Sequence, residues 1–139
     1  MLLTFLVVAA TSATVTFPGG RLDLPSGCEA PASIPMVIDA YAGFIDCGVP
    51  KLRIALSGGA IAPPACGPQP RPSQSVTLQS NAGLPFVVCT RARATERPTG
   101  PISMIIALGG GSLMAEIKTP RDALLLLQLA ASWRPPAKQ

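Results

Sequence analysis

The chain contains no histidine, and this absence excludes several chemistries at once. Without an imidazole there is no Ser-His-Asp or Cys-His arrangement, no histidine-ligated metal site, and no side chain whose ordinary pKa lies near neutrality. Charged residues make up 13% of the sequence and aromatic residues 4%, so both are scarce. The core is therefore expected to be built from Leu, Ile, Val and Ala.

The chain is rich in apolar residues, prolines and glycines. Its 139 residues suffice for one core, and the hydrophobic share of 48% argues against disorder. Sixteen prolines and thirteen glycines predict many turns, which suits a β-rich architecture better than a helical bundle.

The most strongly patterned stretch lies near the C-terminus, from Thr119 to Arg134, and predicts a helix. Thr119 is a suitable N-cap, Pro120 suits the first helical position, and Asp122 places a negative charge near the positive end of the helix dipole. Pro135 ends the pattern. The segment is apolar over most of its surface and shorter than the ~20 residues of a membrane crossing, so it is expected to cover a sheet.

Short apolar segments separated by turns precede this helix and predict strands. Leu52, Ile54 and Leu56 alternate with polar residues, and the almost wholly apolar run Ile102–Leu108 suits a central strand. Further strands are predicted at 14–17, 21–24, 41–47, 75–80, 84–90 and 112–118. The predicted fold class is α+β, an antiparallel sheet of about five to seven strands with one C-terminal helix packed on one face.

A proline- and glycine-rich loop is predicted at Gly58–Gln74, between two of these strands. It is long for a connection in a compact domain, and such loops are either functional or loosely ordered. The glycine run Gly109–Gly111 lies between strand-like segments and lacks the lysine of a phosphate loop, so a hairpin turn is predicted there.

The N-terminal segment Met1–Ala13 is apolar and runs into small residues, as in a secretory signal peptide. Cleavage after Ala13 would leave Thr14 as the mature start of one domain at 14–139. The segment lacks a basic residue and is short, and a misplaced start codon would explain both departures. The alternatives are a hydrophobic first strand and an uncleaved anchor that tethers the protein to the membrane.

The four cysteines, Cys28, Cys47, Cys66 and Cys89, are well separated and form no Cys-x-x-Cys motif. An all-thiolate zinc site usually takes its ligands from two closely spaced pairs, so two disulfides are preferred. Three pairings are open, and Cys28–Cys47 with Cys66–Cys89 joins the segments that are closest in sequence. No metal and no cofactor is assigned.

The carboxylates and the basic residues offer two further candidate sites. Asp39 and Asp46 are near in sequence and could serve a small carboxylate-dependent hydrolase, although surface positions are the preferred account of both. Arg91, Arg93 and Arg97 form the one basic cluster and are a candidate binding surface. No aromatic residue is interleaved with them, so a nucleic-acid partner is not expected.

The order of several turn and packing motifs resembles that of a group of small exported bacterial proteins of unknown function. These motifs are 19–21, 24–28, 42–45, 83–86 and 132–135, and they extend over nearly the whole mature chain. The resemblance implies an envelope protein and brings no catalytic residue. The leading hypothesis is an exported, periplasmic or extracellular, non-enzymatic structural or binding domain whose partner is an envelope protein or polymer. The alternatives are the hydrolase and the membrane-tethered protein.

Overall fold

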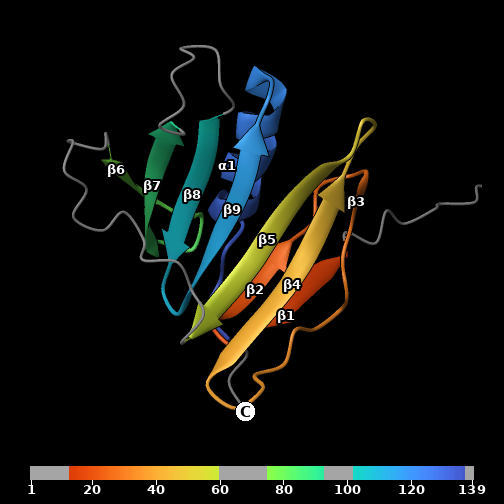
Figure 1. The fold of residues 1–139 in the computed structure, drawn as a ribbon. Helices are drawn as coiled ribbons and strands as arrows, with labels where there is room; N and C mark the ends of the chain where they lie inside the picture. The colour runs from red at the N-terminus through yellow and green to blue at the C-terminus, as the bar shows by residue number, and fades with distance from the viewer. Residues whose placement is uncertain (1–12, 60–74, 93–101, 137–139) are drawn as a thin grey trace, which may run out of the picture.

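The computed structural model describes residues 13–59, 75–92 and 102–136 (Figure 1). Nine strands and one helix lie within these ranges. They are β1 (Thr14–Phe17), β2 (Gly20–Asp23), β3 (Cys28–Glu29), β4 (Ala40–Cys47), β5 (Leu52–Gly59), β6 (Ser75–Gln79), β7 (Pro85–Ala92), β8 (Ile102–Leu108), β9 (Gly111–Ile117) and α1 (Pro120–Ala131).

Seven of the strands form one antiparallel sheet in the order β3-β4-β5-β9-β8-β7-β6. With its single C-terminal helix, this sheet confirms the predicted α+β fold class. The segments 14–17 and 21–24 flank the turn 18–20, which predicts a short hairpin or one bulged strand, and the pairing of β1 with β2 confirms the hairpin. The sequence did not indicate that this hairpin would form a two-stranded sheet separate from the main one. Within the main sheet, strands that are consecutive in the chain pair with each other except β5 and β6. The last strand, β9, lies between β5 and β8 and joins the two halves of the sheet.

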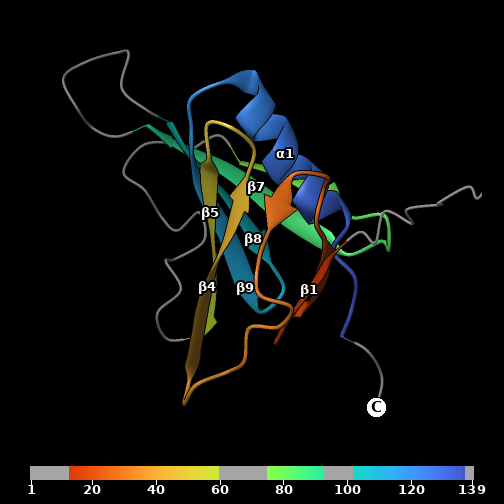
Figure 2. The same cartoon turned by 90° about the vertical axis from the view of Figure 1, so that its right-hand side faces the viewer.

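The core lies on one face of the main sheet, under α1 and the β1–β2 hairpin. Figure 2 shows both elements on the same side of the sheet. Ile54, Leu56, Ile106 and Leu113 point to this side and are fully buried. The predicted alternation in β5 is thereby confirmed, with Arg53 and the other intervening residues facing away.

The helix begins where its capping residues predict, but it ends at Ala131 and not at Arg134. The predicted end is wrong because Arg134 leaves the helix and pairs with Arg21 of β2. Thr119 caps the helix by accepting a hydrogen bond from the Asp122 N–H, and the Asp122 carboxylate accepts one from the Thr119 N–H in return. Its buried residues are Leu126, Leu129 and Ala130, which pack on the sheet. Trp133 follows directly and is also buried, donating a hydrogen bond from Nε1 to the Gly19 carbonyl. It therefore fastens the end of the helix to the N-terminal hairpin.

Tyr41 joins the two halves of the sheet from the core side. Its ring lies over Gly58 of β5 and Gly111 of β9, where an added Cβ would overlap the ring or its hydroxyl. The hydroxyl donates a hydrogen bond to the Gly110 carbonyl, and burial raises its pKa to about 12. The predicted start of the loop at Gly58 is therefore wrong, because Gly58 and Gly59 belong to β5. Only glycine fits where the Tyr41 ring crosses β5. Paired glycines are also typical of loops, and the sequence therefore indicated a loop where the strand continues.

The disulfide Cys28–Cys47 fastens the short strand β3 to the end of β4. This confirms one of the two predicted pairings. Cys89 is buried and disulfide-bonded, but its predicted partner Cys66 lies outside the described residues, so the second pairing stays a prediction. Residues 1–12 also lie outside the described ranges, and β1 begins at Thr14.

Candidate functional site

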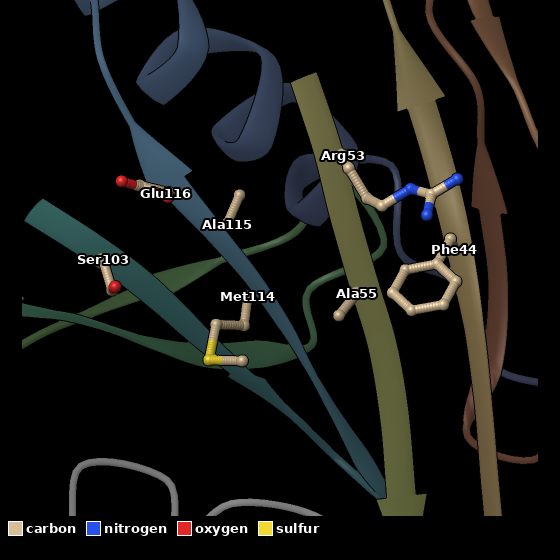
Figure 3. A pocket seen from close by; sticks show the side chains of 7 residues that line it. All are labelled: Phe44, Arg53, Ala55, Ser103, Met114, Ala115 and Glu116. Carbon is tan, nitrogen blue, oxygen red and sulfur yellow. The ribbon is translucent and has the colours of Figure 1, made fainter. Parts of the chain in front are cut away.

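The face of the main sheet that points away from α1 carries a shallow depression of about 240 Å³ (Figure 3). No described helix or strand covers this outer face (Figure 2), so the depression opens outward. Four strands contribute to it, β4, β5, β8 and β9. Its lining residues are Phe44, Arg53, Ala55, Ser103, Met114, Ala115 and Glu116.

The floor of the depression follows from the register of three neighbouring strands. Ala55 lies directly opposite Phe44 on one side and Met114 on the other, so the three side chains share one face. Phe44 is 49% exposed and Met114 38% exposed, and the two side chains lie on either side of the same alanine. A small alanine between two larger neighbours leaves a hollow with apolar walls.

The depression lies where two halves of the sheet separate. The register between β5 and β9 covers three residue pairs and ends at Ala55–Met114, whereas that between β4 and β5 covers eight. Beyond this last pair the two ribbons diverge, with Arg53 on β5 and Glu116 on β9 (Figure 3). The growing separation of β5 and β9 leaves space at one end of the depression. We call this the polar end, because Arg53 and Glu116 line it.

The Arg53 side chain lies at this polar end and makes two contacts. Its guanidinium lies 4.7 Å from the centroid of the Phe44 ring, a cation–π arrangement. Its Nε donates to Asp46 Oδ1 at 3.0 Å and a terminal nitrogen donates to Oδ2 at 3.3 Å, forming a bidentate pair. The hydrogen bond from Arg53 is the main cause of the lowered pKa of Asp46, with smaller charge effects from Arg53 and Lys51. Asp46 therefore ionises at a lower pH than an ordinary aspartate.

Replacing Arg53 by methionine is expected to raise the pKa of Asp46 toward that of an ordinary carboxyl group. The lowered pKa of the folded state implies a contribution to stability that is present above the unfolded pKa and lost as the pH falls through the folded one. A carboxyl-detected NMR titration of Asp46 measures the change directly. Lys51→Met is the matched control and is expected to shift the pKa less, because the Lys51 contribution is the smallest of the causes. Equal shifts in the two variants would contradict the assignment.

Asp39 and Asp46, the carboxylates of the hydrolase hypothesis, lie at opposite ends of β4. Seven residues of extended strand separate them by about 23 Å, at roughly 3.3 Å per residue. Glycoside hydrolysis requires two carboxyl groups within roughly 5 to 9.5 Å of one another. Asp46 is paired with Arg53 besides. The two carboxylates therefore do not form one site.

The basic cluster falls almost wholly outside the described residues. Arg91 is part of β7, opposite Ser103 of β8, but its side chain is not described, and Arg93 and Arg97 lie in the segment 93–101. Within the described ranges, no group of three or more Cys, Asp or Glu side chains is arranged to hold a metal ion. None of the described helices is long and apolar enough to cross a membrane.

The residues of the depression were not singled out from the sequence as a site. Arg53 was identified as a residue of the solvated face of its strand, but Phe44 and Met114 stand among apolar neighbours and resemble core residues. The signal that could have found them is their position: each is flanked by residues that point into the core. On a strand covered on one face, that alternation places a large apolar side chain in solvent.

No family model, curated protein or solved structure matches this chain. The resemblance to small exported bacterial proteins therefore stays an expectation carried by the sequence motifs alone.

Proposed function

We propose that this protein is an exported, disulfide-stabilised, non-enzymatic domain that binds an envelope protein or polymer through the depression on its outer sheet face. The observation that carries the proposal is the exposed apolar pair Phe44 and Met114 around the small floor residue Ala55. Exposed apolar surface rimmed by polar groups is typical of interaction sites. Here Arg53, Glu116 and Ser103 supply that rim.

Export is supported by the cysteines. The Cys28–Cys47 disulfide links two strands of the sheet, and structural disulfides persist in oxidising compartments such as the periplasm. The apolar segment Met1–Ala13 would direct the chain there. If it were not cleaved, the same domain would act while tethered to the membrane.

Binding is favoured over hydrolysis by the chemistry of the depression. Glu116 is the single carboxylate among the described residues that line it, and acid–base hydrolysis of the glycosidase type needs two. The remaining polar rim, a guanidinium and a hydroxyl, suits hydrogen bonding to a partner around a central apolar contact.

The test is site-specific photo-crosslinking in the cells that produce the protein, read out by intact mass. A photoreactive phenylalanine analogue replaces Phe44, and the matched control places it at Leu124, which is 61% exposed on the helix. We expect a discrete adduct from position 44 and none from position 124. The unlinked protein should start near Thr14 and resist thiol alkylation unless it is first reduced.

Each readout can contradict its own part of the proposal. Adducts of equal yield at both positions, or none at position 44, would refute recognition at the depression. A full-length mass with four alkylated thiols in unreduced protein would refute export and the disulfides together.

A further inference from the structure

The strand β6 forms one edge of the main sheet, and no described segment pairs with its outward main-chain groups. In the β6–β7 ladder the Ser80 N–H donates to the Leu84 carbonyl at 2.8 Å. Hydrogen-bonded pairs alternate along an antiparallel ladder, so Val76 and Leu78 also bond to β7. The N–H and C=O groups of Ser75, Thr77 and Gln79 therefore point away from the sheet. Within the described ranges they have no hydrogen-bond partner.

The side chains of β6 are exposed as well. All five are open to solvent, among them Val76 at 54% and Leu78 at 41%. These two lie on the same face as the core residue Ile106, since Val76 is opposite Val88 and Val88 opposite Ile106. The main contacts of α1 are with β9, β8 and β2, so the helix does not shelter them. The sequence had suggested an ordinary alternating strand here, but its apolar side is not buried.

The five residues of β6 include none of the side chains that usually prevent strand pairing. Natural sheets protect their edges with charged side chains, proline, bulges or very short strands. The five residues of β6 are Ser, Val, Thr, Leu and Gln, so neither charge nor proline interrupts them. An extended polypeptide is the chemical group that offers donors and acceptors at the spacing of these main-chain groups.

We propose that two copies of this protein pair through β6, in antiparallel register about a twofold axis at Thr77. In this register Thr77 faces its own copy and Ser75 faces Gln79 of the second copy, so every outward main-chain group is satisfied. Val76 then lies directly opposite Leu78 of the second copy, and the same pair recurs across the axis. The interface is self-complementary, as a twofold dimer requires, and it covers the two exposed aliphatic side chains of each copy.

The opposite edge of the sheet is unsuitable for the same pairing. There β3 pairs with β4 at Asp46, and Val37 bonds to Ala40 in both directions. A strand added along β4 could pair only over the short stretch around Ala42 and Phe44, because these segments occupy the edge on either side of it. The strand β6 has no described segment paired along its outer side.

The twofold axis of such a dimer runs perpendicular to the sheet, so the outer faces of both copies point in the same direction. The two depressions would then lie on one continuous surface. A partner with repeated binding groups could occupy both at once, which raises apparent affinity without any new contact. The pairing itself does not depend on the proposed function.

The test is the dimer dissociation constant of the full chain, measured by sedimentation over a concentration series. Thr77→Lys and Thr77→Glu each place like charges opposite one another across the axis, and each is expected to weaken the dimer about fivefold or more. An equimolar mixture of the two variants should recover wild-type affinity as a heterodimer. Thr77→Pro should abolish pairing while leaving the β6–β7 ladder intact, because the Thr77 N–H points outward.

The matched control is Ala42→Pro, at the outward-pointing position of the opposite edge, which should leave the dimer unchanged. Far-ultraviolet circular dichroism verifies that each variant is folded. A wild-type protein that is monomeric throughout the series would refute the proposal. Unchanged dimerisation in Thr77→Pro, or failure of the charge-swapped mixture to recover affinity, would refute this interface.

Discussion

Replacing Trp133 by alanine is expected to lower the free energy of unfolding by roughly 3 to 5 kcal/mol, the usual range for a buried tryptophan or phenylalanine. The side chain is 5% exposed and fills the space between the end of α1, the β1–β2 hairpin and the β8–β9 turn. Gly20 and Gly109 lie so close to its ring that a Cβ on either would contact it. No smaller side chain can fill this space without leaving a cavity.

The matched control for this prediction is Trp133→Phe, which keeps an aromatic ring but removes the Nε1–H that donates to the Gly19 carbonyl. Its expected cost is smaller, because most of the buried apolar surface remains. Urea unfolding followed by far-ultraviolet circular dichroism measures both. A loss below about 1 kcal/mol for the alanine variant would show that Trp133 does not hold the helix to the hairpin.

Removing the Cys28–Cys47 disulfide with a paired Cys28→Ser and Cys47→Ser substitution is expected to cost about 3 kcal/mol. The two cysteines are 19 residues apart, and in the chain-entropy account the stabilisation depends on the length of the closed loop. The strand β3 has two residues and pairs only with the end of β4, so it depends on this link more than any other described strand.

The comparison is again urea unfolding, with the wild type measured before and after reduction. The reduced wild type should unfold at a lower urea concentration than the oxidised protein, by at least the shift seen in the double variant. A double variant as stable as the oxidised wild type would contradict a structural role for this disulfide. The Cys28–Cys47 disulfide would then no longer support the proposal that the protein is exported.

Predictions from local sequence patterns were confirmed where the structure depends on residues that are close together in the chain. The residues around Thr119 and Asp122 determine where the helix begins, because capping satisfies main-chain groups within one turn. The alternation of Leu52, Ile54 and Leu56 correctly indicated which side of β5 is buried. The close sequence spacing of Cys28 and Cys47 favoured their pairing, which the hairpin-like return of β3 on β4 brings about.

The candidate site and the open edge depend on contacts between distant segments. The depression exists because β9 pairs with β5 over three residues and then diverges, bringing Met114 beside Ala55 and Phe44. Nothing in the local sequence of these strands states which strand will be the neighbour, because many pairings satisfy the same alternation. The exposure of Val76 likewise follows from the position of β6 at an edge that α1 does not reach.

The amino-acid sequence by itself determined the class of the fold, the start of its helix, the buried face of its clearest strand and the absence of imidazole chemistry. These properties depend on composition and on interactions within a few residues. The tertiary structure alone decided the order of the strands, the separation of the N-terminal hairpin from the main sheet, the distance between Asp39 and Asp46 and the uncovered outer face. The physical reason is that strand pairing joins segments far apart in the chain, and the side chains that remain exposed are known only once those pairs have formed.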